Sequence, residues 1–205
     1  MSKSSTRSVP QQTRSQERVD SILDTAADLF TEIGYEASTT NAIAERAGIS
    51  IGTLYRYFSD KDAILRALAA RYHQEEKELF ERVFTDDVIY LPLSVLLDRL
   101  IDPFLDLYCD CPVYAHILLG TDVSADIAAA SQEIEQEVIE RLANIMQKVA
   151  PQIDHQQAYL TAVICKSAVK SLISLRTSSS DGDFRVQITA EIKRMLLAYL
   201  EQVIE

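Results

Sequence analysis

Apolar residues recur every three or four positions along most of this chain, and that spacing is the feature that most limits its fold. The first such run consists of Val19, Ile22, Leu23, Ala26, Ala27, Phe30 and Ile33. These offsets place the whole run on one face of an α-helix. The 205 residues include only five Gly and five Pro, too few for the many tight turns of a β-sandwich or barrel. The sequence therefore predicts an all-α protein.

Composition excludes several other classes of protein. With 47% hydrophobic and 25% charged residues, the chain has enough apolar side chains for a core and is not expected to be disordered. No stretch approaches the roughly 18 uninterrupted apolar residues of a membrane span, so we expect no membrane association. The first twenty residues lack the apolar core of a secretory signal. Three Cys cannot pair completely, which fits free thiols in the cytoplasm.

The negative charge of the chain is unevenly distributed. Its formal net charge is -11, yet residues 1–72 hold nine basic and nine acidic side chains and are neutral. The remainder holds 11 basic and 22 acidic side chains. A neutral first part can present a basic face to phosphate groups while the acidic remainder lies elsewhere.

Residues 39–62 contain closely spaced start and stop signals for short helices. Thr39 or Thr40 can cap a helix of about two turns that Gly48 ends. Ser50 can cap a second short helix over residues 51–58, and Ser59 can begin a longer one. Two short helices joined by a tight turn, behind a longer amphipathic helix, form a helix-turn-helix unit, whose second helix fits the major groove of DNA.

The helix predicted over residues 51–58 has two distinct faces. With Leu54 pointing inward, Ile51 and Phe58 lie within about 60° of it on the helical wheel and form a buried stripe. The opposite side carries small, hydroxyl-bearing and cationic residues that suit base edges and phosphates. The residues expected to contact DNA, including nearby helix starts, are Thr40, Ser50, Gly52, Thr53, Tyr55, Arg56, Tyr57 and Lys61. The alternative is an ordinary helical bundle with a solvated Arg and two surface Tyr.

Residues 39–58, followed by 59–62, resemble the DNA-binding region of the TetR family of bacterial transcriptional regulators. The resemblance covers about residues 15–65. It implies an all-helical homodimer with a DNA-binding head and a larger ligand-binding body. In such proteins the positions that match the residues above approach DNA, except that Arg56 matches a position that varies in the family.

We therefore predict three segments. Residues 1–13 are polar and form a disordered arm, residues 14–60 form the helix-turn-helix domain, and residues 61–205 form a helical effector-binding and dimerisation domain. In the third segment, Phe104, Tyr108, Tyr114 and His116 are the candidates for lining a pocket. Because few cationic residues lie near these side chains in the sequence, we expect a largely apolar effector. The last two helices are expected to form the dimer, with small residues such as Ala162 allowing close approach.

No cofactor, metal or catalytic site is expected. Cys109-Asp110-Cys111 with His116 offers metal-ligating atoms, but this spacing is no recognised zinc signature and a helix would direct the two thiols to different faces. No orienting acid accompanies a Cys–His pair, so an enzyme is not expected. The prediction is a ligand-responsive repressor that binds a palindromic operator. The alternative is a carrier or sensor of apolar molecules that does not bind DNA.

Overall fold

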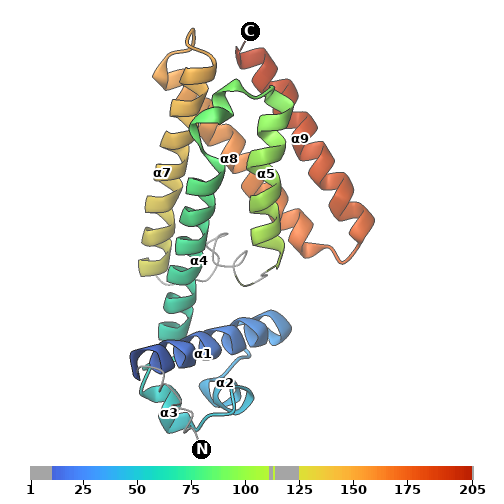
Figure 1. Cartoon of the computed structure of the whole chain (residues 1–205). Coiled ribbons are helices and arrows are strands. Elements are labelled where there is room, and N and C mark those ends of the chain that lie inside the picture. The colour runs from blue at the N-terminus through green and yellow to red at the C-terminus, as the bar shows by residue number, and fades with distance from the viewer. Residues whose placement is uncertain (1–10, 111–112, 114–124, 205) are drawn as a thin grey trace, which may run out of the picture. The chain divides into compact units, whose positions relative to one another are not determined.

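The computed structural model describes residues 11–110, 113 and 125–204, and every regular element within them is helical (Figure 1). The all-α prediction is confirmed. The chain separates into two compact units, Met1–Leu68 and Ala69–Glu205. This boundary falls later than the predicted one after residue 60, because the first turns of the fourth helix bury Ile64, Leu65 and Leu68 in the first unit.

Three complete helices and the start of a fourth make up the first unit. They are α1 (Gln11–Ile33), α2 (Thr40–Arg46), α3 (Ile51–Tyr55) and the first turns of α4 (Lys61–Val83). The predicted end of the disordered arm at residue 13 is wrong, because α1 already includes Gln11–Thr13. Residues 1–10 lie outside the described part. Gly34 follows α1 with φ 82°, a left-handed conformation that glycine adopts without steric cost.

Side-chain caps define the starts of the short helices. The Thr39 hydroxyl accepts a hydrogen bond from the Ala42 amide at 3.2 Å, and the Ser50 hydroxyl accepts one from the Thr53 amide at 3.1 Å. Both caps agree with the sequence prediction. The cap of α4 does not, because Asp60 Oδ1, rather than Ser59, accepts from the Ala63 amide at 2.6 Å.

The third helix is shorter than the predicted span of residues 51–58. The amides of Tyr57 and Phe58 both donate to the carbonyl oxygen of Leu54, at 2.9 and 3.0 Å. This double acceptance ends the regular helix at Tyr55 and turns the chain. Arg56 and Tyr57 therefore lie in the turn after α3.

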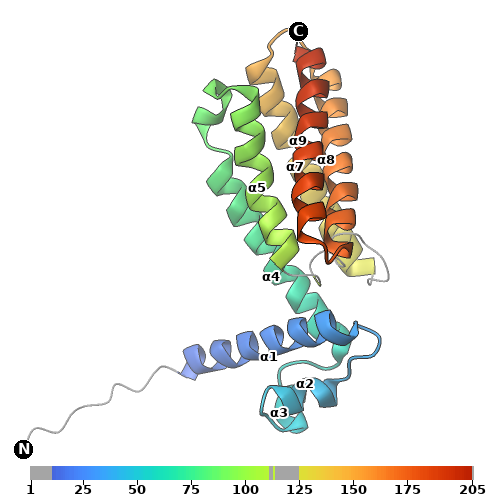
Figure 2. The ribbon, with the colours of Figure 1, turned by 90° about the vertical axis from the view of Figure 1, so that its right-hand side faces the viewer.

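The second unit is a helical bundle. Besides the rest of α4, it contains the 3₁₀ helix η1 (Asp86–Tyr90), α5 (Leu93–Asp110), α7 (Ala125–Val149), α8 (His155–Ser178) and α9 (Gly182–Ile204). Figure 2 shows α8 and α9 running side by side. Pro103 lies inside α5.

Small residues bring α7 and α8 together. Ala143, Ala158 and Ala162 are almost fully buried in one core cluster with Ile139. The expectation that Ala162 serves close approach between subunits is wrong, because its methyl group packs within the chain. Among the described residues, one segment, His155–Arg176 in α8, is long and apolar enough to cross a membrane. A single such helix is weak evidence, since core helices pass the same test.

Candidate nucleic-acid interface and candidate effector cavity

The two faces of α3 differ as the sequence predicts. Leu54 is 0% exposed and Phe58 8%, so both anchor the helix in the first unit. On the other side Tyr55 is 52% exposed, and Gly52 and Arg56 are exposed as well. Burying one side of a five-residue helix holds it in place, because so short a helix is not stable alone. The exposed side is therefore a preformed surface.

Hydroxyl groups join the starts of α2 and α3 to this surface. Thr40 Oγ1 lies 3.2 Å from the Tyr55 hydroxyl, and Ser50 Oγ lies 2.8 Å from Thr53 Oγ1. The structure thus brings these four predicted residues together in two pairs. Each hydroxyl can also bond to a phosphate oxygen or a base edge, because a hydroxyl both donates and accepts.

Arg56 and Tyr57 form a third pair in the turn after α3. The guanidinium carbon of Arg56 lies 5.3 Å from the centroid of the Tyr57 ring, within cation–π range. The hydrogen bond from Arg56 lowers the pKa of the Tyr57 phenol, with a further contribution from the Ser15 hydroxyl. Arg56 is thus held over the Tyr57 ring and is exposed to solvent.

Lys61 has partners that the sequence did not predict. Its ammonium donates to the carbonyl oxygens of Tyr35 at 2.7 Å and Glu36 at 3.3 Å, and lies 4.1 Å from the Tyr35 ring centroid. The Tyr35 hydroxyl in turn donates to Asp62. Two of the three ammonium donors are used within the chain, which leaves one for a phosphate. No periodic pattern marks Tyr35 in the sequence, so its role emerges only from the fold.

A pair of charges braces α2 against α1. The Arg46 guanidinium donates through both terminal nitrogens to the two carboxylate oxygens of Glu32. The bidentate bond lowers the pKa of Glu32 and is exposed to solvent. Arg46 is therefore committed to the fold, which leaves Arg56, exposed after α3, and Lys61, at the start of α4, as the cationic residues predicted to contact DNA.

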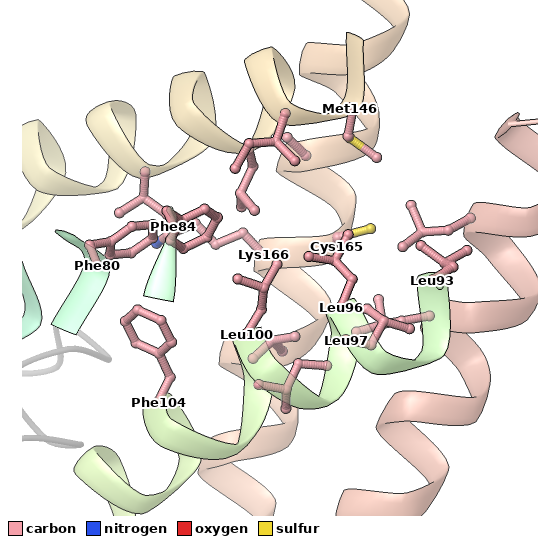
Figure 3. Close-up of a pocket in the computed structure, with 18 of the residues that line it drawn as sticks. Phe80, Phe84, Leu93, Leu96, Leu97, Leu100, Phe104, Met146, Cys165 and Lys166 are labelled. Atoms are coloured by element: carbon pink, nitrogen blue, oxygen red, sulfur yellow. The ribbon is translucent and has the colours of Figure 1, made fainter. Parts of the chain in front are cut away.

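The second unit contains an apolar cavity of about 160 Å³ (Figure 3). Its wall comes from α4, α5, α7, α8 and α9. Phe80 and Phe84 stack with ring centroids 4.4 Å apart, and Phe104 lies 4.9 Å from Phe80. The leucines of α5 and Met146 of α7 face the same space. A cavity of similar size in another protein stays dry and binds benzene, so this one suits a hydrocarbon group.

Few polar groups line the cavity, and each of them is hydrogen-bonded, ion-paired or buried. The Tyr108 hydroxyl donates to the carboxylate of buried Glu76 at 2.7 Å. Lys166 lines the wall with its stem, and its ammonium lies 3.0 Å from Glu135 Oε1. Burial raises the pKa of the Cys165 thiol to about 11, so it is uncharged at neutral pH.

The sequence identified only part of this wall. Phe104 and Tyr108 are among the lining residues, whereas Tyr114 and His116 lie outside the described residues, and ligand contact by any of the four stays a prediction. Cys165 is half-buried at the wall. The aliphatic lining of α5 is predictable as one face of a helix but not as the wall of a cavity, because that depends on which helices meet. The side chains of Cys109 and Cys111 also fall outside the described part.

The first unit is thus a helix-turn-helix module, and the second is a helical bundle around an apolar cavity. Comparison with family models agrees with both halves. Residues 22–68 match the model described as bacterial regulatory proteins of the tetR family, and residues 92–200 match the tetracyclin repressor-like C-terminal domain. The chain belongs to the TetR family of bacterial regulatory proteins.

Individual relatives give the same assignment. The transcriptional repressor KstR of Mycobacterium tuberculosis is 25% identical over 182 residues, which cover 86% of this chain and 80% of that protein. KstR of Rhodococcus jostii is 47% identical over 55 residues, covering 27% of this chain and 26% of that protein. In three of the first curated relatives, the match spans only 26–42% of their length. A TetR-like regulator from Rhodococcus sp. RHA1 has the same fold, with a TM-score of 0.71, 19% identity and coverage of 95% and 99% of the two chains.

Proposed function

We propose that the chain is a cytoplasmic, ligand-responsive repressor that binds a palindromic operator as a homodimer and is released by a small, largely apolar effector. The proposal that α3 binds DNA rests on one observation, namely that this helix has a buried side and an exposed side. Leu54 is fully buried, while Tyr55 and Arg56 face solvent. In this proposal Tyr55, Thr53 and Arg56 read base edges, because hydroxyl, methyl and guanidinium groups all match the major groove.

Exposed apolar side chains on the last two helices support the homodimer. Leu160, Ile164 and Leu175 of α8 and Met195 of α9 are each 43–53% exposed in the single chain. The three residues of α8 lie within about 60° of one another on the helical wheel, and an exposed apolar helix face of this kind is typical of an interaction site. A two-fold pair uses the same surface of both copies, which then read two half-sites about 34–36 Å apart in inverted orientation. A palindromic operator follows from that symmetry. The apolar character of α8 is accounted for by the same interface.

The apolar cavity supports an effector that changes DNA affinity. An effector releases DNA only by binding more tightly to the form of the dimer that does not fit the operator. Changing from almost fully bound to almost fully released requires a preference of about 10⁴-fold, or about 5.5 kcal/mol. Helix α4 starts in the first unit and contributes Phe80 to the cavity in the second, and Phe84 follows directly after its last residue. It is the covalent route by which occupancy of the cavity can act on the DNA-binding unit.

The second candidate function is a carrier of apolar molecules that does not bind DNA. It is favoured by one observation, namely that every residue lining the cavity lies between Glu76 and Ile204. Salt dependence separates the two functions. A DNA-binding dimer releases counterions, so the logarithm of its affinity falls linearly with the logarithm of the salt concentration. A carrier that does not bind DNA shows no salt-dependent affinity for any added duplex.

The experiment is selection of duplexes from a random pool, followed by gel shift with four variants. Tyr57→Ala and Lys61→Ala are expected to weaken binding to all selected sequences, because they remove phosphate contacts. Thr53→Ala and Tyr55→Ala are expected to change which sequence is preferred. Lys148→Ala, at an exposed position in the last turn of α7, serves as the control for a lost charge. Four variants that all bind like the wild type, or a pool from which nothing is enriched, would contradict the proposal.

A further inference from the structure

A second, more polar cleft adjoins the apolar cavity. It also measures about 160 Å³ and lies between α4 and α7. Phe80 and Val138 belong to the walls of both spaces. The two spaces are therefore neighbours that share an aromatic ring and a short aliphatic side chain in their walls. A ring that lies between two spaces can turn aside, whereas a backbone segment cannot.

Cationic groups predominate in the cleft. Among the described residues, its wall includes Lys77, Arg141 and His73, against a single carboxylate, Glu137. Arg141 donates to Glu137 at 2.7 Å, so its guanidinium is held at the cleft, and Lys77 is exposed beside it. His73 lies 3.2 Å from the Ser131 hydroxyl, and burial lowers its pKa. With His73 neutral, two positive charges face one negative charge.

The apolar cavity offers an anion much less. Its ammonium group, on Lys166, contacts Glu135, and its other charged wall residue is the carboxylate of Glu76. A ligand with an anionic group would lose free energy by placing that group beside a buried carboxylate. The same group in the cleft would gain hydrogen bonds from Lys77 and Arg141. The hydrocarbon part, in contrast, gains most in the apolar cavity.

We infer that the effector is amphipathic, with a hydrocarbon body in the apolar cavity and a carboxylate or phosphate group in the cleft against Lys77 and Arg141. This inference rests on the proposed function, in which the apolar cavity binds the effector. A ligand that spans both spaces displaces the Phe80 ring from its stack on Phe84. Phe80 is therefore the partition between the two subsites, and it lies on α4.

The test measures binding of four compounds with the same eight-carbon tail to the full chain by calorimetry. Octanoate and octyl phosphate carry anionic groups, 1-octanol is neutral and octylamine is cationic. We expect both anions to bind at least tenfold more tightly than octylamine. The affinity of octanol should be weaker than that of the anions and stronger than that of octylamine. The ratio of octanoate to octyl phosphate affinity identifies which anion the cleft prefers. Leu100→Trp, which fills the apolar cavity, is expected to weaken all four.

Variants of the cleft then isolate the head group. Lys77→Gln and Arg141→Gln are each expected to weaken octanoate binding by about two- to fivefold, as for partly exposed charge pairs, and to leave octanol unchanged. Glu137→Gln removes the carboxylate that competes for Arg141, so it should strengthen octanoate binding, a gain that misfolding cannot imitate. Lys148→Gln, the control, should change nothing.

Two results would overturn the inference. Equal affinity for octanoate and octanol, with no effect of the cleft variants, would show that the cleft recognises no anion. If none of the four compounds binds, the inference is likewise overturned. Release of DNA is measured in parallel, so the two proposals can fail separately. If octanol binds as well as octanoate and still releases DNA, the proposed function stands and the anionic subsite does not.

Discussion

The ammonium group of Lys61 lies 4.1 Å from the centroid of the Tyr35 ring and donates to the Tyr35 carbonyl oxygen at 2.7 Å. The first residue of α4 is thereby fixed to the turn that follows α1. The hydroxyl of the same tyrosine donates to Asp62, the next residue of α4. Lys61 thus has a structural role in the first unit besides its predicted contact with phosphate, and the two roles can be measured separately.

Substitutions at Lys61 and Tyr35 should affect DNA binding in different ways. In the proposed dimer, Lys61→Ala removes one predicted phosphate contact from each subunit, so affinity should fall for every duplex and the salt slope should decrease by about 1.8. Tyr35→Leu removes the ring and the bond to Asp62 but leaves the charge, so affinity should fall with the slope unchanged. Salt titrations of fluorescence anisotropy measure both quantities. If Lys61→Ala leaves the slope unchanged, Lys61 serves only as an anchor of the fold.

Two glycines near α3 should respond oppositely to alanine. A Cβ at Gly52 would meet no atom closer than Ser50 Oγ at 4.0 Å, so Gly52→Ala should keep or raise the free energy of unfolding by about 0.5 kcal/mol. The added methyl group stands on the exposed side of α3, so DNA affinity should fall about fivefold or more. Gly48→Ala is the control.

Gly48 has φ +64° and open space around it, so its replacement costs only backbone strain, about 1–2 kcal/mol. Thermal unfolding and anisotropy on both variants give the comparison. Gly52→Ala should lose DNA affinity without losing stability, and Gly48→Ala should lose stability. Unchanged DNA affinity in Gly52→Ala would mean that α3 does not approach DNA closely at this position.

Elements governed by local signals could be predicted from the sequence. Thr39 and Ser50 cap helices because their hydroxyls bond to amides three residues away, and such a pattern is visible in the sequence. The end of α3 was not predictable in this way. Phe58 continues the apolar stripe, so periodicity extended the helix to it, whereas the shared acceptor at Leu54 ends the helix at Tyr55.

The sites depended more strongly on contacts between distant residues. Lys61 and Tyr35 are far apart in sequence, and nothing in the composition of either segment indicates their contact. The cavity shows the same limit, since Phe104 and Tyr108 were predicted from their aromatic rings but Phe80 and Met146 were not singled out. A pocket arises from the arrangement of several helices, and periodicity gives only the buried face of each one.

The proposed homodimer should be sensitive to a charge on α8. Ile164 is 43% exposed in the single chain, so Ile164→Glu should leave the subunit folded while placing a carboxylate in the interface. Val95 on α5 is 45% exposed, which makes Val95→Glu a matched control. Sedimentation velocity at about 10 µM should show a monomer for the first variant and a dimer for the second.

Loss of the dimer should also weaken operator binding by about 10²-fold or more, because two linked heads bind far more tightly than one. This is measurable by gel shift on a duplex with two half-sites. A wild-type chain that is monomeric at this concentration would contradict the homodimer, and so would a dimer that tolerates Ile164→Glu.

The thiol of Cys165 reports on the cavity through its pH dependence. Burial raises the pKa of this thiol from 9.0 to about 11. Only the thiolate reacts with iodoacetamide, so at pH 7.5 the folded protein should react about 100-fold more slowly than a thiol with the ordinary pKa. The rate should rise about tenfold per pH unit up to about pH 10. For the protein unfolded in denaturant, the alkylation rate should level off above about pH 9.

The same shift affects stability in a defined direction. Because the folded-state pKa exceeds the unfolded value, the folded protein holds its proton more tightly. The contribution of Cys165 to stability is therefore complete below pH 9 and is lost as the pH rises toward 11. The experiment uses Cys109→Ser/Cys111→Ser so that one thiol remains, with mass spectrometry as the readout. A ligand in the cavity should slow alkylation further. A rate that levels off near pH 8.5 in the folded protein would show that Cys165 is freely solvated and does not face an apolar cavity.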